Sequence, residues 1–233
     1  MSASKRTVLL LHGWGSNFKA CWVDTGWKDL LIEQGFNVLE IDLKGHGQRN
    51  LSHELNDYSD LAQDVLDQLP NFEEPIIAIG YSLGCKVLLE MIYRKQKMFK
   101  KIILGGLGYN AFSSKEALGE DVADYLENRS KNPSNPMVRA LADYGINNGN
   151  DPLSIAACLK RTPNPIITRE KLSKIRFPTL IVCGDQDEVA YPTTKLKQSI
   201  HQSQEIILKG INHLDLPNSS EFKKATLDFL NTE

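Results

Sequence analysis

The 233-residue chain has no large excess of charge of either sign. Its 27 Lys and Arg residues stand against 29 Asp and Glu residues, so no basic field is available to attract nucleic acid. Long apolar runs are lacking too. The first run, residues 8–11, is too short for the core of a signal peptide or for a bilayer span. We therefore expect a cytoplasmic protein that binds neither nucleic acid nor membranes.

Cysteine is also scarce. The chain has four cysteines, which are widely spaced, form no C-x-x-C pair and have no histidine at ligand spacing: Cys21, Cys85, Cys158 and Cys183. This pattern excludes a disulfide framework and a zinc-binding motif, and it predicts reduced, mostly buried thiols. We expect no metal and no cofactor. A chain of this length can bury a sizeable core without such supports.

Short apolar, β-branched runs recur along the chain and predict six strands. They are residues 8–11, 38–41, 76–79, 102–104, 180–182 and 206–208. Amphipathic helical patterns lie between most of them, and this alternation predicts a mostly parallel sheet flanked by helices. No repeat and no Gly/Ser-rich linker divides the chain, so residues 1–233 are expected to form one domain.

The alternation is interrupted at about residues 109–176. This stretch lacks strand patterns and gathers several prolines: Pro133, Pro136, Pro152, Pro163 and Pro165. Proline limits helix length, so several short helical segments are predicted here. We interpret the stretch as a helical lid inserted over the sheet. Its apolar residues and those just before it are candidates for an acyl pocket: Met98, Phe99, Tyr109, Phe112, Tyr125, Met137 and Tyr144.

The motif G-x-S-x-G occupies residues 80–84, directly after an apolar strand pattern and directly before an amphipathic helix. This context is typical of a nucleophile elbow, with Ser82 as the nucleophile. Gly80 and Gly84 would relieve collisions in the sharp turn. The N–H of Leu83, at the helix start, faces charge that develops on a substrate oxygen. The alternative is that Ser82 only caps the helix.

A serine hydroxyl needs a general base, and the chain has five histidines. His213 follows the last predicted strand, at the same sheet edge as the elbow, and is the favoured base. His201 and His53 are interpreted as surface residues. His46 lies in a glycine-containing turn, where it is a loop residue or part of the pocket wall, and His12 is interpreted as structural.

The acid that orients the histidine is expected between the nucleophile and the base in the chain. Residues 184–188 follow the strand pattern at 180–182 and contain three carboxylates. From position alone, Asp185, Asp187 and Glu188 all remain candidates. A second glycine cluster, residues 105–108, lacks the Lys-Ser/Thr of a phosphate-binding loop and predicts a turn beneath the lid.

Five segments in this order resemble the α/β-hydrolase family, in its serine-nucleophile, carboxylesterase-like branch. They are residues 11–15, 42–47, 80–84 and 184–187, and His213. The resemblance implies the α/β-hydrolase fold, with Asp187 as the triad acid and the N–H of Trp14 as a second oxyanion-hole donor beside that of Leu83. Members that are haloalkane dehalogenases or epoxide hydrolases carry an aspartate at the position of Ser82, so those activities are disfavoured.

The resemblance implies a serine hydrolase that acts on small-molecule carboxylic esters through an acyl-enzyme intermediate, and the apolar residues of the lid segment favour small to medium acyl groups. Thioesterase activity, cofactor-free perhydrolase activity and carbon–carbon bond hydrolysis remain open, because they use the same triad. A non-catalytic ligand-binding protein on the same scaffold is a further alternative. That alternative predicts a lost triad member, whereas Ser82, Asp187 and His213 are all present.

Overall fold

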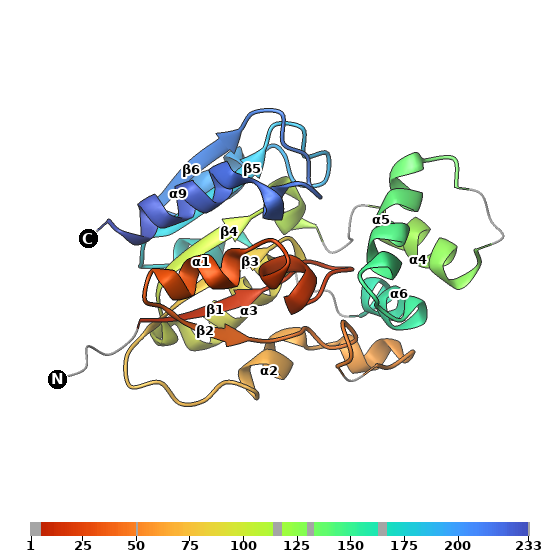
Figure 1. Cartoon of the computed structure of the whole chain (residues 1–233), viewed down its shortest axis with the longest axis horizontal. Helices are drawn as coiled ribbons and strands as arrows, with labels where there is room; N and C mark the ends of the chain where they lie inside the picture. Colours follow the sequence, from red (N-terminus) through yellow and green to blue (C-terminus); the bar gives the residue numbers. More distant parts are fainter. Residues whose placement is uncertain (1–5, 50, 114–117, 130–132, 163–166, 233) are drawn as a thin grey trace.

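The structure is a computed structural model that describes residues 6–49, 51–113, 118–129, 133–162 and 167–232. Within these residues, six strands form one parallel sheet in the order β2-β1-β3-β4-β5-β6 (Figure 1). The strands are β1 (Thr7–Leu11), β2 (Asn37–Glu40), β3 (Ile76–Tyr81), β4 (Phe99–Gly105), β5 (Thr179–Gly184) and β6 (Ser203–Leu208). Each predicted strand is thereby confirmed, with small shifts at the ends.

Helices cover both faces of the sheet. They are α1 (Trp27–Glu33), α2 (Leu61–Leu66), α3 (Leu83–Lys95), α7 (Arg169–Ser173), α8 (Thr194–Ser199) and α9 (Ser220–Leu230). Shorter helical turns occupy Lys19–Val23, Leu55–Tyr58, Gln96–Met98, Tyr109–Phe112 and Leu216–Asn218. α1 and α9 pack on one face, where Figure 1 shows them side by side, and α2, α3, α7 and α8 pack on the other.

Alternate residues of each strand enter different cores, because successive side chains of a strand point to opposite faces. In β1, Leu9 and Leu11 pack with α3, whereas Val8 and Leu10 face α1 and α9. Burial on both faces explains why the inner strands read as continuous apolar runs. On the α1 side, Trp27 and Phe222 meet edge-to-face with ring centroids 4.8 Å apart and join α1 to α9.

The predicted interruption between the fourth and fifth strands is confirmed. It contains α4 (Gly119–Glu127), α5 (Pro136–Asn147) and α6 (Pro152–Lys160), which lie beyond the carboxyl ends of the strands (Figure 1) and share their own apolar cluster. Pro136 and Pro152 occupy the first turns of α5 and α6, where a missing N–H costs nothing. Pro163 and Pro165 lie outside the described residues.

All four cysteines are buried free thiols, as predicted. In the part of the chain that the structure describes, no helix combines the length and the apolar composition that crossing a bilayer requires.

Candidate active site

Ser82 is the single residue between the end of β3 and the start of α3, and its backbone has φ 51° and ψ -114°. A non-glycine residue in this region is strained, and it projects its side chain away from the sheet edge. A Cβ on Gly84 would lie 2.2 Å from the Leu11 carbonyl oxygen, and one on Gly80 would lie 2.9 Å from the backbone of Cys85. The predicted reason for both glycines is therefore confirmed.

The hydroxyl of Ser82 points toward His213. Its Oγ lies 2.9 Å from His213 Nε2, and the serine is half-buried. The same hydroxyl makes no capping hydrogen bond to α3, a helix that the structure describes in full. The interpretation of Ser82 as only a helix cap is therefore wrong. His213 lies in the loop after β6, as expected.

The other ring nitrogen of His213 faces Asp187. Nδ1 lies 2.8 Å from Asp187 Oδ2, and the carboxylate is only 1% exposed. Asp187 Oδ1 accepts two further hydrogen bonds, from the N–H groups of Val189 (3.0 Å) and Ala190 (2.9 Å). An ionised carboxylate can only accept, so Nδ1 carries the imidazole proton and Nε2 presents its lone pair to Ser82.

The other two carboxylates of this loop point elsewhere. Asp185 Oδ1 accepts a hydrogen bond from the N–H of Gly210 at 2.7 Å, which ties the loop after β5 to the loop after β6. Glu188 is exposed to solvent. Of the three candidates, Asp187 is the one in contact with His213. The structure brings Ser82, His213 and Asp187 together in one hydrogen-bonded chain.

Two further groups that the sequence did not reveal hold His213 in place. The hydroxyl of Tyr81 donates to the backbone carbonyl of His213 at 2.6 Å, and the two rings lie 5.3 Å apart. Gly106, at φ 66°, passes so close that a Cβ on it would lie 3.2 Å from His213 Cε1. Gly106, one of the glycines in the cluster at residues 105–108, thus packs against the histidine, a role that sequence spacing alone does not indicate.

Ser82 opens into a pocket between the sheet edge and helices α4 to α6. Apolar side chains from the helices and the neighbouring loops line it: Val122, Leu141, Leu159, Val189 and Leu214. Of the seven apolar residues proposed from the sequence, only Tyr144 contributes to this wall. The prediction was wrong for the others because Phe99 and Tyr125, for example, are buried inside the cores of the sheet and of the helical insertion.

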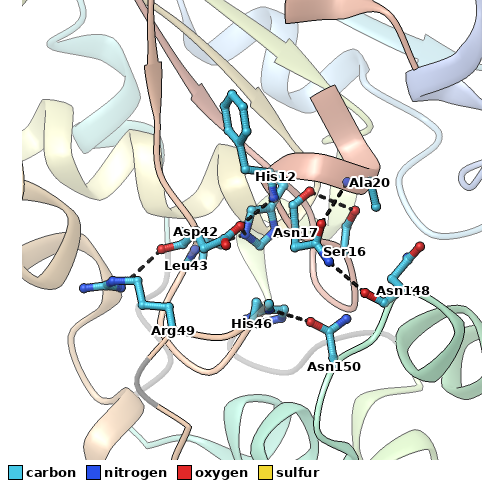
Figure 2. A network of polar contacts seen from close by, with 12 residues as sticks. His12, Ser16, Asn17, Ala20, Asp42, Leu43, His46, Arg49, Asn148 and Asn150 are labelled. Carbon is cyan, nitrogen blue, oxygen red and sulfur yellow. Dashed lines mark hydrogen bonds and ion pairs between the residues drawn. The ribbon is translucent and has the colours of Figure 1, made fainter. Parts of the chain in front are cut away.

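The other four histidines are not among the described residues that line the Ser82 pocket. His12 and His46 are fully buried in contact with each other (Figure 2), and His12 Nε2 accepts from the N–H of Leu43 at 3.0 Å. Burial lowers the pKa of His12 to about 4, and burial with the neighbouring His12 lowers the pKa of His46 to about 3, so both are neutral at pH 7. His53 and His201 are exposed, as predicted.

Trp14 and Leu83 both line the pocket at Ser82. The indole Nε1 of Trp14 donates to the carbonyl of Ile155 in α6 at 2.9 Å, which fixes the loop after β1 against the helical insertion. Leu83 is the first residue of α3, where N–H groups lack partners within the helix. Among the described residues, no three His, Cys, Asp or Glu side chains gather as a metal site.

The fold is a parallel sheet with helices on both faces. At its edge, a serine in a strained strand-to-helix turn is hydrogen-bonded to a histidine, which in turn contacts a buried aspartate. These features together define a class of α/β proteins with hydrolytic chemistry. The sequence profile of the alpha/beta hydrolase family matches residues 8–221. The chain belongs to this family.

Similar proteins agree with this assignment. The chain is 26% identical to the AB hydrolase superfamily protein YisY of Bacillus subtilis (strain 168), over 89% of this chain and 85% of the relative. It is 24% identical to the pimeloyl-[acyl-carrier protein] methyl ester esterase of Nitrosospira multiformis, over 89% and 87%. The crystal structure of a bromoperoxidase from Bacillus anthracis matches its fold with a TM-score of 0.74 and 21% identity, over 98% and 93%.

Proposed function

We propose that this protein is a serine esterase that hydrolyses carboxylic esters of small to medium acyl groups. One observation carries the proposal: Ser82 Oγ, His213 and Asp187 form a continuous chain of hydrogen bonds of 2.9 and 2.8 Å, and the serine end of that chain opens into a pocket. The similarity to the pimeloyl-[acyl-carrier protein] methyl ester esterase covers most of both chains, and it supports an ester as the substrate.

In the first half of the reaction, His213 Nε2 takes the hydroxyl proton as Ser82 Oγ attacks the ester carbonyl carbon. The N–H groups of Trp14 and Leu83 donate to the oxyanion that forms. Asp187 stabilises the imidazolium through Nδ1–H. When the tetrahedral intermediate collapses, the imidazolium gives its proton to the leaving alkoxide, and an alcohol departs from the acyl-enzyme.

In the second half, water takes the place of the alcohol. His213 removes a proton from this water, the hydroxide adds to the acyl carbonyl, and the same two N–H groups hold the second oxyanion. Collapse returns the proton to Ser82 and releases the carboxylic acid. The balance is one ester and one water consumed for one acid and one alcohol.

We further propose that the segment at about 109–176 acts as a lid that selects the acyl group. Val122 of α4, Leu141 of α5 and Leu159 of α6 each line the pocket, so each helix contributes an apolar side chain to the wall. A wall of this kind suits the apolar part of an acyl group. Thioesters and activated carbon–carbon bonds are attacked through the same triad, and a substrate panel separates them from esters.

Labelling with a fluorophosphonate probe tests the nucleophile. Wild type is expected to label and Ser82→Ala is expected not to, with a fall in kcat of about 10⁴-fold or more on p-nitrophenyl esters. Ser220→Ala, at an exposed serine that begins α9, is the matched control and should label like wild type. Equal labelling of wild type and Ser82→Ala would contradict the proposal.

A panel of p-nitrophenyl esters and acyl thioesters of graded chain length, assayed with wild type, tests the substrate class. Higher kcat/KM for the esters, with an optimum at a short or medium chain, is the expected result. Preference for the thioesters would move the assignment to thioesterase on the same Ser82.

A further inference from the structure

We propose that the side-chain amide of Asn110 donates a hydrogen bond to the substrate, and that the enzyme therefore selects acyl groups with a second carbonyl oxygen beyond the ester. This inference rests on the proposed esterase function and narrows its substrate class. It starts from a polar side chain that the triad chemistry does not use. Asn110 lines the Ser82 pocket and is only 4% exposed.

The orientation of the Asn110 amide is fixed by a hydrogen bond within its own loop. Its Oδ1 accepts from the backbone N–H of Gly108 at 3.0 Å. A backbone N–H can only donate, so the amide atom that faces Gly108 is the oxygen and not the nitrogen. Nδ2, with its two N–H donors, lies at the other end of the amide group. Within the residues that the structure describes, no group accepts a hydrogen bond from Nδ2.

The loop that carries Asn110 is held against the loop of the triad acid. A Cβ on Gly108 would collide with the carbonyl oxygen of Ala190, so the two backbones are in close contact. The N–H of Tyr109 donates to the same carbonyl at 3.0 Å. Ala190 in turn donates its N–H to Asp187 at 2.9 Å. The amide of Asn110 therefore keeps one position relative to the triad.

The same loop begins beside the nucleophile. It follows β4, which is the neighbour of β3 in the sheet. The N–H of Ser82 donates to the carbonyl of Gly105, the last residue of β4, at 2.8 Å. Asn110 lies five residues further along the chain and lines the same pocket as Ser82. A substrate with its ester carbonyl at Ser82 thus places its acyl group in the space that Asn110 borders.

Burial of the amide discriminates between acyl groups. A wholly apolar acyl chain that fills the pocket removes water from Nδ2 and leaves a donor unpaired, which is unfavourable. A carbonyl oxygen in the same place replaces the lost hydrogen bond, and it brings no hydrogen of its own that needs a partner. Sites that donate to a substrate reject the analogue without the polar group more strongly than an apolar pocket rejects a missing methylene group.

Matched substrates test this preference in wild type. We would compare the ethyl esters of 4-oxopentanoic, 5-oxohexanoic and 6-oxoheptanoic acid with analogues in which a methylidene group replaces the oxo group. The replacement keeps the planar shape and removes the acceptor. Wild type is expected to favour at least one oxo ester over its analogue by about tenfold to a hundredfold in kcat/KM, the range for leaving a buried donor unpaired. Equal kcat/KM in all three pairs would overturn the proposal.

Asn110→Asp separates recognition from a structural role. A carboxylate oxygen still accepts from the N–H of Gly108, but the second oxygen cannot donate. The ratio of kcat/KM within the favoured pair should therefore fall toward one, largely through a higher KM for the oxo ester. A general loss of activity cancels in this ratio. Asn71→Asp, at an exposed asparagine before β3, is the matched control and should keep the wild-type ratio. A wild-type ratio in Asn110→Asp would contradict the assignment.

A spectroscopic measurement separates this inference from the esterase function. Ser82→Ala cannot form an acyl-enzyme, and its Asn110 side-chain amide signals in a nitrogen-15 NMR spectrum are identified by their absence from the Ser82→Ala/Asn110→Asp double variant. A downfield shift of these amide protons that is larger with an oxo ester than with its methylidene analogue supports the contact even if wild type hydrolyses no ester. Equal shifts in all three pairs, or no shift at all, overturn the contact even if Ser82 proves to be an esterase nucleophile.

Discussion

The side-chain amide of Asn150 donates to the carbonyl oxygen of Gly15 at 2.8 Å, across 135 positions of sequence. The same amide donates to Gly145 (2.8 Å), and its oxygen accepts from the N–H of Gly47 (2.8 Å). Asn150 is only 5% exposed, and its bonds to Gly15 and Gly145 are shielded from water. It joins the end of α5 to the loops after β1 and β2.

Neighbouring residues strengthen this junction. Figure 2 shows Asn17, from the loop after β1, donating to the backbone carbonyl of Asn148, from the end of α5, at 2.7 Å. Asn148 in turn donates to Gly15 at 3.0 Å. Because Gly15 directly follows Trp14, these bonds fix the loop that carries one proposed oxyanion donor.

Asn150→Asp is expected to weaken both folding and catalysis. The substitution keeps the shape but turns two donors into an acceptor that faces the carbonyls of Gly15 and Gly145, at a cost of about 2–4 kcal/mol in the free energy of unfolding. Urea denaturation measures this cost. At temperatures where the variant is folded, kcat on a p-nitrophenyl ester should fall more than tenfold, because the loop that carries the proposed oxyanion donor Trp14 loses its support. Asn147→Asp, at an exposed position in the same helix end, should change either quantity little.

Asp187→Asn is expected to lower kcat by about 10⁴-fold, since an amide no longer holds the His213 proton on Nδ1. Asp185→Asn retains an oxygen that can accept from Gly210 and should lower kcat less than tenfold. Steady-state kinetics on one ester compares the two variants. The reverse ranking would transfer the role of triad acid to Asp185.

Acid is expected to destabilise the protein through two buried histidines. With its pKa lowered from 6.5 to about 4, His12 stays neutral in the folded state at pH values where the unfolded chain binds a proton. The free energy of unfolding therefore falls as the pH drops below 6.5, by about 3 kcal/mol for His12 by pH 4. His46, with a pKa of about 3, acts in the same direction and over a wider range.

Urea denaturation between pH 8 and pH 4 measures this dependence. His46→Leu removes one of the two titrating groups, so its stability should decline less steeply than that of wild type below pH 6.5. His201→Leu, at an exposed histidine, should keep the wild-type slope. An unchanged slope in His46→Leu would show that His46 takes up its proton within the folded protein.

Gly106→Ala is expected to act on catalysis through His213. A Cβ at this position would lie 3.2 Å from His213 Cε1 and so would displace the imidazole from Ser82. The positive φ of 66° adds about 1–2 kcal/mol of strain. Gly35→Ala is the matched control, since Gly35 has φ 80° with no described atom within 4 Å of its Cβ position. Both variants should lose stability, and only Gly106→Ala should lose kcat by tenfold or more.

Local sequence patterns were sufficient for most of the fold. The strands lie where apolar, β-branched runs occur, and α3 begins directly after residues 80–84 because the glycines there permit a turn that other residues would block. Both signals depend on residues within a few positions of each other, so they are visible without tertiary structure. The position of His213 followed from chain order, because parallel strands end at one edge of the sheet.

By itself, the sequence determined which segments form strands and helices along the chain, the sharp turn at Ser82 and the loops that hold His213 and Asp187. Only the tertiary structure decided which loop carboxylate faces the histidine and that Asn150 is hydrogen-bonded to Gly15. Asp185 and Asp187 differ by two positions, yet loop conformation sends one to Gly210 and the other to His213. The contact between Asn150 and Gly15 joins residues 135 positions apart, and such a pair depends on how the helices pack rather than on any periodic pattern.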